Sequence, residues 1–342
     1  MAKNEMHMQR LSIIGAGAWG TALAIAAHRA GRDVTIWAFE ADVAAAINDS
    51  GQNSFYLPGF ALDRSICATT DIAVAARADA LLLTMPAQHL RRVAAGLAPH
   101  VKADTPVVIC AKGIEVGTGA LLSEVVSEVL PMAVPAVLSG PTFAAEVARG
   151  LPTAVTLAAC DEQLAERLAA AIGTPHLRIY TATDVIGAEI GGAVKNVLAI
   201  ACGIVGGRKL GDNTRAALIT RGLAEILRLG LAKGAKLETL MGLSGIGDLT
   251  LTCNAMQSRN YSLGVALGQG KALADILANR RSVAEGVFTA SSVVSLARRL
   301  GVEMPICTAI DAIINHGADL NEAISRLLSR PLRPEPLDNK GR

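Results

Sequence analysis

The sequence is poor in aromatic residues, at 3%, and in charged residues, at 18%, whereas hydrophobic residues fill 51% of its 342 positions. This apolar content excludes a disordered chain. The length exceeds what one ordinary hydrophobic core organises, so we expect two domains.

An excess of charge of one sign is also lacking. Lysine and arginine total 32 against 30 aspartates and glutamates, which gives a formal net charge of +2, and no long basic run is present. Proteins that bind nucleic acid concentrate positive charge on one surface, so we predict no nucleic-acid partner.

Metal-binding and disulfide patterns are missing. No C-x-x-C or H-x-x-x-H spacing occurs, and we therefore predict no metal ion. The six cysteines are far apart and mostly have apolar neighbours: Cys67, Cys110, Cys160, Cys202, Cys253 and Cys307. Such cysteines are typical of reduced thiols, so we expect a cytoplasmic protein.

One uncharged stretch, Leu11–Ala27, follows Lys3 and Arg10 and resembles a signal peptide or a membrane span at first sight. Its glycines divide it into a short strand and a helix. No later stretch supplies the roughly 20 apolar residues that a span requires. We predict no membrane span.

Short β-branched runs alternate with alanine-rich helical segments from the N-terminus to about Tyr180. This alternation is the pattern of βαβ units in a parallel sheet. Several runs are continuously apolar, as strands buried on both faces should be. The expected strands are Arg10–Ile14, Asp33–Trp37, Ala80–Thr84, Pro106–Ala111, Ala136–Ser139, Thr153–Leu157 and Leu177–Tyr180.

The pattern changes after Asp184 to long helical stretches. They are Val185–Ile204, Asn213–Gly230, Ala284–Leu300, Ile306–His316 and Leu320–Leu328. The sequence thus predicts an α/β domain over residues 1–184 and an all-α domain over residues 185–330. Residues 331–342 combine proline with charge, and we expect a flexible tail there.

Three glycines in the first βαβ unit, Gly15, Gly17 and Gly20, follow a strand and open a helix. The first allows a tight turn, the second lets the backbone approach a pyrophosphate, and the third lets the helix pack closely. A bare G-x-G-x-x-G is often only a flexible loop. The complete β-α-β setting favours a Rossmann-type domain that binds a dinucleotide.

Residues at the end of the second strand select between NAD and NADP. A carboxylate there binds the ribose hydroxyls of NAD and repels the extra phosphate of NADP, whereas a basic residue does the reverse. Phe39 is followed here by Glu40, which favours NAD. Because Glu40 comes a few residues late, it could equally be an acid that interacts with the dipole of the next helix.

Lys195 and Asn196 interrupt the otherwise apolar helical segment Ile190–Cys202. A lone lysine in such a segment usually extends its ammonium group to solvent. Gly191 and Gly192 weaken the same helix by about 1 kcal/mol each relative to alanine. That cost is easier to understand if another group must approach the backbone, so the segment favours a functional lysine.

A second polar cluster occupies the glycine-rich segment Leu243–Asn260, which we expect to be a loop. It carries Asp248, Thr252, Ser258, Arg259 and Asn260. An arginine with neutral hydrogen-bond donors suits a phosphate monoester. The Ser-Arg-Asn sequence could equally be the N-cap region of the helix that follows.

Together these motifs resemble NAD(P)-dependent glycerol-3-phosphate dehydrogenases over nearly the whole chain. The matching segments come from both predicted domains in the family's order. They are the glycine motif, Ser139–Val155, Gly191–Ile204, Thr214–Ile226, Gly242–Cys253, Ser258–Gly264 and Val283–Gly286. The resemblance implies an oxidoreductase that interconverts dihydroxyacetone phosphate and sn-glycerol 3-phosphate with NAD or NADP, supplying glycerol 3-phosphate for phospholipid synthesis.

The resemblance also implies residue roles, with Lys195 as the catalytic proton acceptor. The substrate would contact Lys112, Gly140, Thr142, Lys195, Asp248, Ser258, Arg259 and Asn260. The cofactor would contact Gly15, Gly17, Ala18, Trp19, Gly20, Phe39, Glu40, Lys112, Ala144, Arg259, Val283 and Glu285. Many bacterial members have serine in place of Ala18 and a basic residue in place of Phe39, and the second difference favours NAD.

Oxidation of the C2 alcohol requires a base within hydrogen-bond reach of the hydroxyl group. A lysine with the ordinary pKa of about 10.4 is protonated near neutrality. Burial and the positive nicotinamide should lower the pKa of Lys195. We expect Asp248 or Asn196 to orient its ammonium group, and Arg259 and Asn260 to hold the phosphate.

Two other functions stay open. One is a Rossmann dehydrogenase that acts on a different hydroxy acid or hydroxyacyl substrate, although the Ser-Arg-Asn cluster suits a phosphate better. The other is a dinucleotide sensor without catalysis, which would need neither Lys195 nor Asp248. The alanine-rich helical second half is also compatible with a homodimer.

Overall fold

The computed structural model describes residues 8–278 and 284–331. The chain forms two compact units. The first runs up to Lys112 and resumes over Leu121–Ala188, and the second contains Gly113–Ala120 and the chain from Glu189 on. The domain boundaries drawn from the sequence stay a prediction. Of the tail expected to be flexible, residues 332–342 lie outside the described residues.

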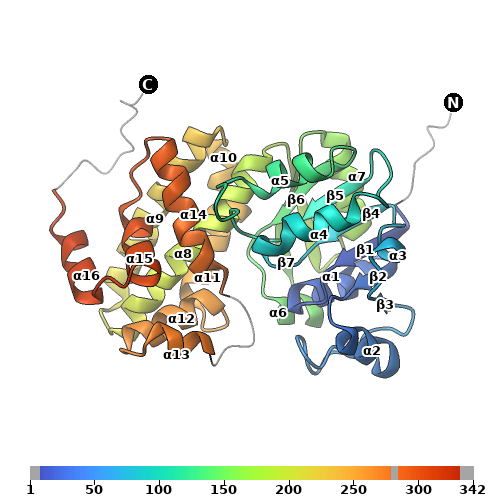
Figure 1. The fold of residues 1–342 in the computed structure, drawn as a ribbon, viewed down its shortest axis with the longest axis horizontal. Helices are drawn as coiled ribbons and strands as arrows, with labels where there is room; N and C mark the ends of the chain where they lie inside the picture. Colours follow the sequence, from blue (N-terminus) through green and yellow to red (C-terminus); the bar gives the residue numbers. More distant parts are fainter. Residues whose placement is uncertain (1–7, 279–283, 332–342) are drawn as a thin grey trace. The chain divides into compact units, whose positions relative to one another are not determined.

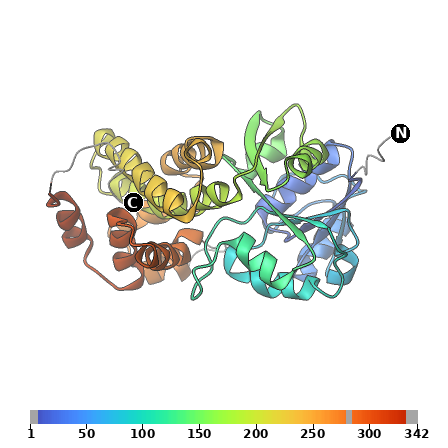
Figure 2. The same ribbon diagram turned by 90° about the horizontal axis from the view of Figure 1, so that it is seen from above.

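The first unit is built on one eight-stranded sheet with the order β3-β2-β1-β4-β5-β6-β7-β8. Its strands are β1 (Arg10–Ile14), β2 (Asp33–Trp37), β3 (Cys67–Thr69), β4 (Ala80–Leu83), β5 (Pro106–Ile109), β6 (Val134–Ser139), β7 (Thr153–Ala159) and β8 (Leu177–Ala182). The strand order reverses between β1 and β4, as in Rossmann folds. The predicted α/β first half followed by a helical second half is confirmed (Figures 1 and 2).

One pairing differs from the expected parallel sheet. β7 runs antiparallel to β6, with Val137 opposite Ala158, and β8 is parallel to β7. The connection between β6 and β7 contains only the short helix α6 (Ala144–Arg149). A parallel crossover usually contains a full helix, whereas the helix in this connection has six residues. The sheet is therefore mixed.

Helices cover both sides of the sheet (Figure 2). α1 (Ala18–Arg29) packs with α6 and with α7 (Glu162–Ile172), while α3 (Ile72–Ala75), α4 (Leu90–Leu97) and α5 (Leu122–Val129) pack in series. α2 (Ala41–Ser50) packs on β3, and a 3-10 turn, η1 (Ala87–His89), precedes α4. The core between these layers consists of aliphatic side chains from the strands and the alanine-rich face of α1.

The second unit is helical in its described part. Its elements are α8 (Val185–Gly207), α9 (Asp212–Lys233), α10 (Leu237–Leu240), the π-helical turn η2 (Leu243–Gly247), α11 (Asp248–Asn254), α12 (Arg259–Gly268), α13 (Leu273–Ala278), α14 (Glu285–Arg299), α15 (Pro305–Asn315) and α16 (Leu320–Leu328). The prediction of a loop over Leu243–Asn260 is wrong, because most of this segment is helical. Its glycines permit close packing between helices and do not mark an irregular segment.

The helix α8 is unusually apolar. The expectation that no later stretch is apolar enough for a membrane span is wrong for this helix: among the described residues it alone is long and apolar enough by composition. However, 89% of its most apolar window is buried inside the protein. Burial of this kind is what the core helix of a globular protein shows.

Glycines on α8 and α12 let the two backbones approach closely. A Cβ atom added to Gly203 would collide with the carbonyl oxygen of Tyr261, and one added to Gly264 would collide with the carbonyl oxygen of Ile200. Gly207 and Gly268, one turn further along each helix, meet the same obstacle from the opposite backbone. The crossing therefore depends on the absence of side chains at these positions.

A buried carboxylate caps another helix of this unit. Glu225 of α9 accepts hydrogen bonds from the backbone nitrogens of Ile306 (2.6 Å) and Cys307 (3.1 Å), which lie in the first turn of α15. Burial raises the pKa of Glu225, and the two backbone donors oppose that shift. The contact ties α9 to the positive end of α15.

The segment Gly113–Ala120 is held within the second unit by an arginine. Arg299 of α14 donates to the carbonyl oxygens of Thr118 (2.7 Å) and Gly119 (3.0 Å). Gly119 has a φ of 63°, and a side chain there would meet the guanidinium group of Arg299.

Gly203→Ala should lower the thermal unfolding midpoint of the protein. Overpacking at a close crossing costs about 1–3 kcal/mol, which exceeds the gain in helix propensity of about 1 kcal/mol. Gly96→Ala is the matched control: it also lies within a helix, but its added Cβ would make only ordinary contact with Ile72. The control should be neutral or stabilising, and equal midpoints for both variants would contradict the close-crossing argument.

Candidate active site

Each unit holds part of the predicted site. In the first unit, the glycine loop joins β1 to α1. Gly15 has a φ of 122°, and a Cβ there would lie 2.8 Å from the Thr84 hydroxyl oxygen. A Cβ on Gly20 would collide with the carbonyl oxygen of Gly15, whereas one on Gly17 would meet nothing within 4 Å. Gly15 and Gly20 thus serve the turn and the packing, and Gly17 leaves open space beside the backbone.

The N-terminus of α1 faces that open space. Gly17 is the N-cap residue, Ala18 and Trp19 begin the first turn, and this turn contains no acidic residue. The first N–H groups of a helix lack intrahelical acceptors and attract anions. Buried Asn53 braces the loop, because its side-chain nitrogen donates to the carbonyl of Ala16 (2.7 Å) and the hydroxyl of Thr21 (2.8 Å).

Phe39 and Glu40 follow β2 after one residue, Ala38. The Phe39 ring is 68% exposed. Glu40 is the N-cap residue of α2 but makes no side-chain cap bond there; its carboxylate accepts a hydrogen bond from the Tyr56 hydroxyl (2.9 Å). Burial and this hydrogen bond raise the pKa of Tyr56. Tyr56 thus positions the Glu40 carboxylate at the start of α2, and this carboxylate makes no capping hydrogen bond.

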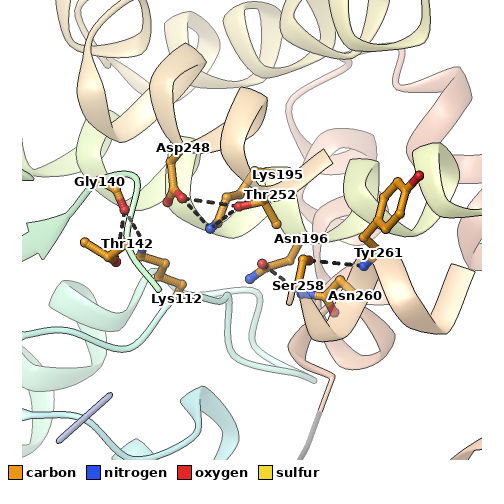
Figure 3. A network of polar contacts seen from close by, with 10 residues as sticks. All are labelled: Lys112, Gly140, Thr142, Lys195, Asn196, Asp248, Thr252, Ser258, Asn260 and Tyr261. Carbon is orange, nitrogen blue, oxygen red and sulfur yellow. Dashed lines mark hydrogen bonds and ion pairs between the residues drawn. The ribbon is translucent and has the colours of Figure 1, made fainter. Parts of the chain in front are cut away.

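Further predicted residues follow β5 and β6. The Lys112 ammonium donates to the carbonyl oxygen of Gly140 (2.9 Å), and the Thr142 hydroxyl donates to the same oxygen (3.3 Å) (Figure 3). Gly140 has a φ of 151°, and a Cβ there would lie 2.9 Å from Val155 Cα. Ala144 is the first residue of α6. These residues share the carboxyl edge of the parallel strands with the glycine loop, where ligands of Rossmann folds bind.

This edge fits a nicotinamide dinucleotide. The loop offers open backbone at Gly17 and a helix N-terminus for the pyrophosphate. Ser139, at the carboxyl end of β6, has a buried hydroxyl oxygen that finds no hydrogen-bond partner among the described residues. Glycines, a helix N-terminus and an unused polar group thus occupy the edge where the cofactor was expected.

The second unit holds a buried ion pair. The Lys195 ammonium of α8 donates to Asp248 Oδ1 (2.5 Å) and to the Thr252 hydroxyl (2.7 Å), both on α11 (Figure 3). The exposed fractions of the two charged side chains are 7% and 0%. Of the two residues expected to orient Lys195, Asp248 contacts it directly, whereas Asn196 accepts a hydrogen bond from Asn260 (2.9 Å).

Glycines bring Asp248 to Lys195. A Cβ on Gly191 would collide with the carbonyl oxygen of Ser244, and one on Gly245 would collide with that of Leu240. The π-helical turn can therefore lie directly on α8, four residues before Lys195. Such turns are frequent at functional sites. The expectation that another group approaches the backbone at Gly191 is confirmed.

The Ser-Arg-Asn cluster divides by burial. Ser258 is the N-cap of α12, where its hydroxyl accepts from the backbone nitrogen of Tyr261 (3.2 Å). Asn260 is buried and bridges two elements, since it donates to Asn196 and accepts from the backbone nitrogen of Gly286 (3.0 Å). Arg259 lies between them at the first position of α12 with an exposed side chain.

Two predicted cofactor contacts, Val283 and Glu285, precede Gly286 in the sequence. Glu285 is the first residue of α14. Val283 lies outside the described residues. A Cβ on Gly286 would approach the carbonyl oxygen of Asn196 to 2.6 Å, so the start of α14 packs against α8 beside Lys195.

Two other kinds of chemistry find no support here. Within residues 8–278 and 284–331, no group of three or more histidine, cysteine or acidic side chains could hold a metal ion. Cys253 lies on α11 near the ion pair, but a hydrogen bond with Cys202 and burial raise the pKa of its thiol. A thiol that stays protonated is a poor nucleophile.

Comparison with known proteins agrees with this arrangement. Family models for the N-terminus and the C-terminus of NAD-dependent glycerol-3-phosphate dehydrogenase match residues 10–165 and 184–325. The chain belongs to this family. Its relatives include glycerol-3-phosphate dehydrogenase [NAD(P)+] of Parvibaculum lavamentivorans, 58% identical over 96% of this chain and 98% of the relative.

Two further relatives extend the match. The enzyme of the same name from Rhodospirillum rubrum is 60% identical over 96% of this chain and 94% of the relative. Among solved structures, glycerol-3-phosphate dehydrogenase of Coxiella burnetii matches with a TM-score of 0.91 at 38% identity, covering 95% of this chain and all 100% of that chain. The resemblance stated from the sequence motifs is thereby confirmed.

The structure adds residues that the sequence left out of the predicted site. Thr252 bonds to Lys195 and lies four residues after Asp248 on α11. An i, i+4 spacing places two side chains on one face of a helix. The pairing of Thr252 with Asp248 could therefore be predicted only if the segment was assigned as a helix. Asn53 carries no such signal, because it lies in a loop far along the chain from the glycines that it braces.

Gly17→Ala should weaken NADH binding without changing stability, whereas Gly20→Ala should lower stability. The added Cβ of Gly17→Ala meets open space, so the apo protein should keep its thermal midpoint, while NADH affinity falls at least about tenfold because the pyrophosphate can no longer approach. Gly20→Ala should lower the apo midpoint by clashing with Gly15. Thermal unfolding with and without NADH measures both effects, and undiminished stabilisation of Gly17→Ala by NADH would exclude the loop as the pyrophosphate site.

Proposed function

We propose that the chain is an NAD(P)-dependent glycerol-3-phosphate dehydrogenase that interconverts dihydroxyacetone phosphate and sn-glycerol 3-phosphate. The buried, hydrogen-bonded group of Lys195, Asp248 and Thr252 carries this proposal, because it holds an ammonium group, which is a proton donor, in a fixed position. The names of the curated relatives agree with it. The nicotinamide, when bound, accepts or donates the hydride.

Lys195 is the proposed proton donor to the oxygen on C2. The Lys195 ammonium nitrogen lies 2.5 Å from Asp248 Oδ1, and an ammonium group can donate a hydrogen bond to a ketone oxygen. As hydride reaches C2, the ammonium delivers its proton to the oxygen and an alcohol results. In the reverse direction the neutral amine removes the hydroxyl proton.

Asp248 and Thr252 are positioning residues in this scheme. They accept two hydrogen bonds from the Lys195 ammonium group. Because both acceptors lie on one face of α11, the Lys195 side chain is held in a fixed direction. Fixed direction is what a proton transfer in the transition state requires.

Arg259 is the proposed phosphate ligand. Its guanidinium group is exposed at the start of α12, while buried Ser258 and Asn260 cap that helix and bridge it to α8. We therefore assign Ser258 and Asn260 a share in holding the α12 N-terminus toward the phosphate, in addition to any direct contact. The positive end of α12 and the guanidinium group favour the same dianion.

The location, oligomeric state and metabolic direction of the protein belong to the same proposal. Four of the six free cysteines are buried, namely Cys110, Cys202, Cys253 and Cys307, which agrees with reduced thiols in the cytoplasm. A homodimer and net flux toward glycerol 3-phosphate for phospholipid synthesis are the proposed assembly and direction. Light scattering of the purified protein measures the first, and assays in both directions measure the second.

The test of the proposed function is the oxidation of NADH and NADPH by purified protein with dihydroxyacetone phosphate. Unphosphorylated dihydroxyacetone is the control. Phosphate-dependent loss of absorbance of the reduced nicotinamide supports the reaction and the substrate together. If a hydroxy acid or hydroxyacyl substrate is turned over instead, or nothing is turned over although the dinucleotide binds, the proposal fails.

Lys195→Met should reduce kcat by about 10²–10⁴-fold while NADH binding is retained, because only the proton transfer is lost. The change leaves Asp248 buried without its cation, which destabilises the fold. The double variant Lys195→Met with Asp248→Leu should recover stability and remain inactive. If kcat of the single variant stays within a few-fold of the wild type, Lys195 does not transfer the proton.

Arg259→Ala should raise the KM for dihydroxyacetone phosphate and also lower kcat. Binding energy from the phosphate, remote from C2, is used to orient the reacting carbon. Residual turnover of unphosphorylated dihydroxyacetone should fall much less, because that substrate has no phosphate, and it serves as the internal control. Steady-state kinetics that match the wild type would remove Arg259 from the substrate site.

A further inference from the structure

An exposed aromatic ring and a cation meet at the adenosine end of the first unit's edge. The guanidinium carbon of Arg92 lies 5.6 Å from the centroid of the Phe39 ring. The ring is 68% exposed, and it contacts Trp37 edge-on at 6.4 Å between centroids. An exposed aromatic ring that already carries a cation on one side offers its remaining surface to a flat ligand.

The topology places this pair beside the glycine loop. Phe39 follows β2, and Arg92 lies in the first turn of α4, which follows β4. In the sheet, β2 and β4 are the two neighbours of β1. The two side chains therefore approach each other from both sides of the strand that leads into the glycine loop.

Residues at the end of β2 read the adenosine ribose of a dinucleotide. Neither Phe39 nor Ala38 carries a positive charge there, and Glu40, held by Tyr56, is negative. Judged from β2 alone, the site would exclude the 2′-phosphate of NADP. Arg92, which lies in the connection after β4, places a guanidinium group over the Phe39 ring at this position.

We propose that Arg92, held over Phe39, is the residue that accepts the 2′-phosphate of NADP and lets this chain bind both dinucleotides. The inference rests on the proposed binding of a nicotinamide dinucleotide. Arginine suits the role because its planar fork donates two parallel hydrogen bonds to a phosphate. Glu40 and Arg92 then act in opposite senses, the first toward the ribose hydroxyls of NAD and the second toward the phosphate of NADP.

The neighbouring arginine provides a matched control. Arg91 is engaged in a two-pronged ion pair with Glu128, at 2.8 Å and 2.9 Å. Arg91→Gln and Arg92→Gln remove the same charge from adjacent residues of α4. Any general loss of positive potential should affect both variants, whereas loss of a phosphate ligand should affect Arg92→Gln alone.

The experiment measures equilibrium dissociation constants of NADPH and NADH, and of the fragments 2′,5′-ADP and 5′-AMP, by calorimetry. Arg92→Gln should weaken NADPH and 2′,5′-ADP roughly tenfold, as expected for loss of a charge-assisted hydrogen bond at an exposed site. NADH and 5′-AMP should change less than about twofold. Arg91→Gln should leave all four constants unchanged, and Arg92→Lys should recover part of the loss.

The salt dependence gives a second readout. The preference for 2′,5′-ADP over 5′-AMP should fall with ionic strength in the wild type and stay flat in Arg92→Gln. An equal loss for both fragments in Arg92→Gln would assign Arg92 to the adenine ring and overturn the proposal, as would no loss at all. Because no step requires turnover of dihydroxyacetone phosphate, failure of the proposed reaction would be seen separately.

Discussion

Close approach between backbones, permitted by glycine, is the constraint on which the second unit depends. The π-helical turn lies against Gly191 of α8. The helix α12 lies against Gly203 and Gly207, further along α8. The first approach places Asp248 beside Lys195, and the second holds α12, which begins with Ser258 and Arg259, along the same helix. A side chain at any of these glycines would push away an element that carries a residue of the proposed site.

The ion pair between Lys195 and Asp248 affects both the stability of the fold and the proposed proton transfer. Buried charges are costly unless they are paired and hydrogen-bonded, and the Thr252 hydroxyl completes this group. The same neighbours that make the buried ammonium tolerable also fix its direction. The proposed catalytic lysine on an apolar core helix is thus stabilised by acceptors on a separate helix, and neither helix could provide the arrangement alone.

Much of the fold could be predicted from the sequence because buried parallel strands are short apolar runs bounded by helices. The seven expected strands all occur, whereas β3 is only three residues long and gave no such run. The direction of β7 could not be predicted, since an apolar run reads the same for parallel and antiparallel pairing. Segment Leu243–Asn260 was assigned as a loop because glycine ordinarily breaks helices; here glycine serves contact between helices.

Part of the candidate site could also be predicted from the sequence. Lys195 stands out because a charged residue within an apolar helix needs an explanation, and the motifs of the family resemblance supplied Asp248 and Arg259. Thr252 was named in the polar segment, but its contact with Lys195 was not predicted, since the segment was assigned as a loop. Arg92 gave no signal, because its position over Phe39 arises from two strand connections that only the folded sheet brings together.

The capture of Gly113–Ala120 by Arg299 has a consequence for how the chain is made and divided. The polypeptide passes between the two units three times, after Lys112, after Ala120 and after Ala188. Neither unit is a continuous stretch of sequence, so a fragment that ends near Asp184 carries away a segment whose partner, Arg299, is synthesised more than a hundred residues later. A single cut in the chain therefore cannot divide it into the two units.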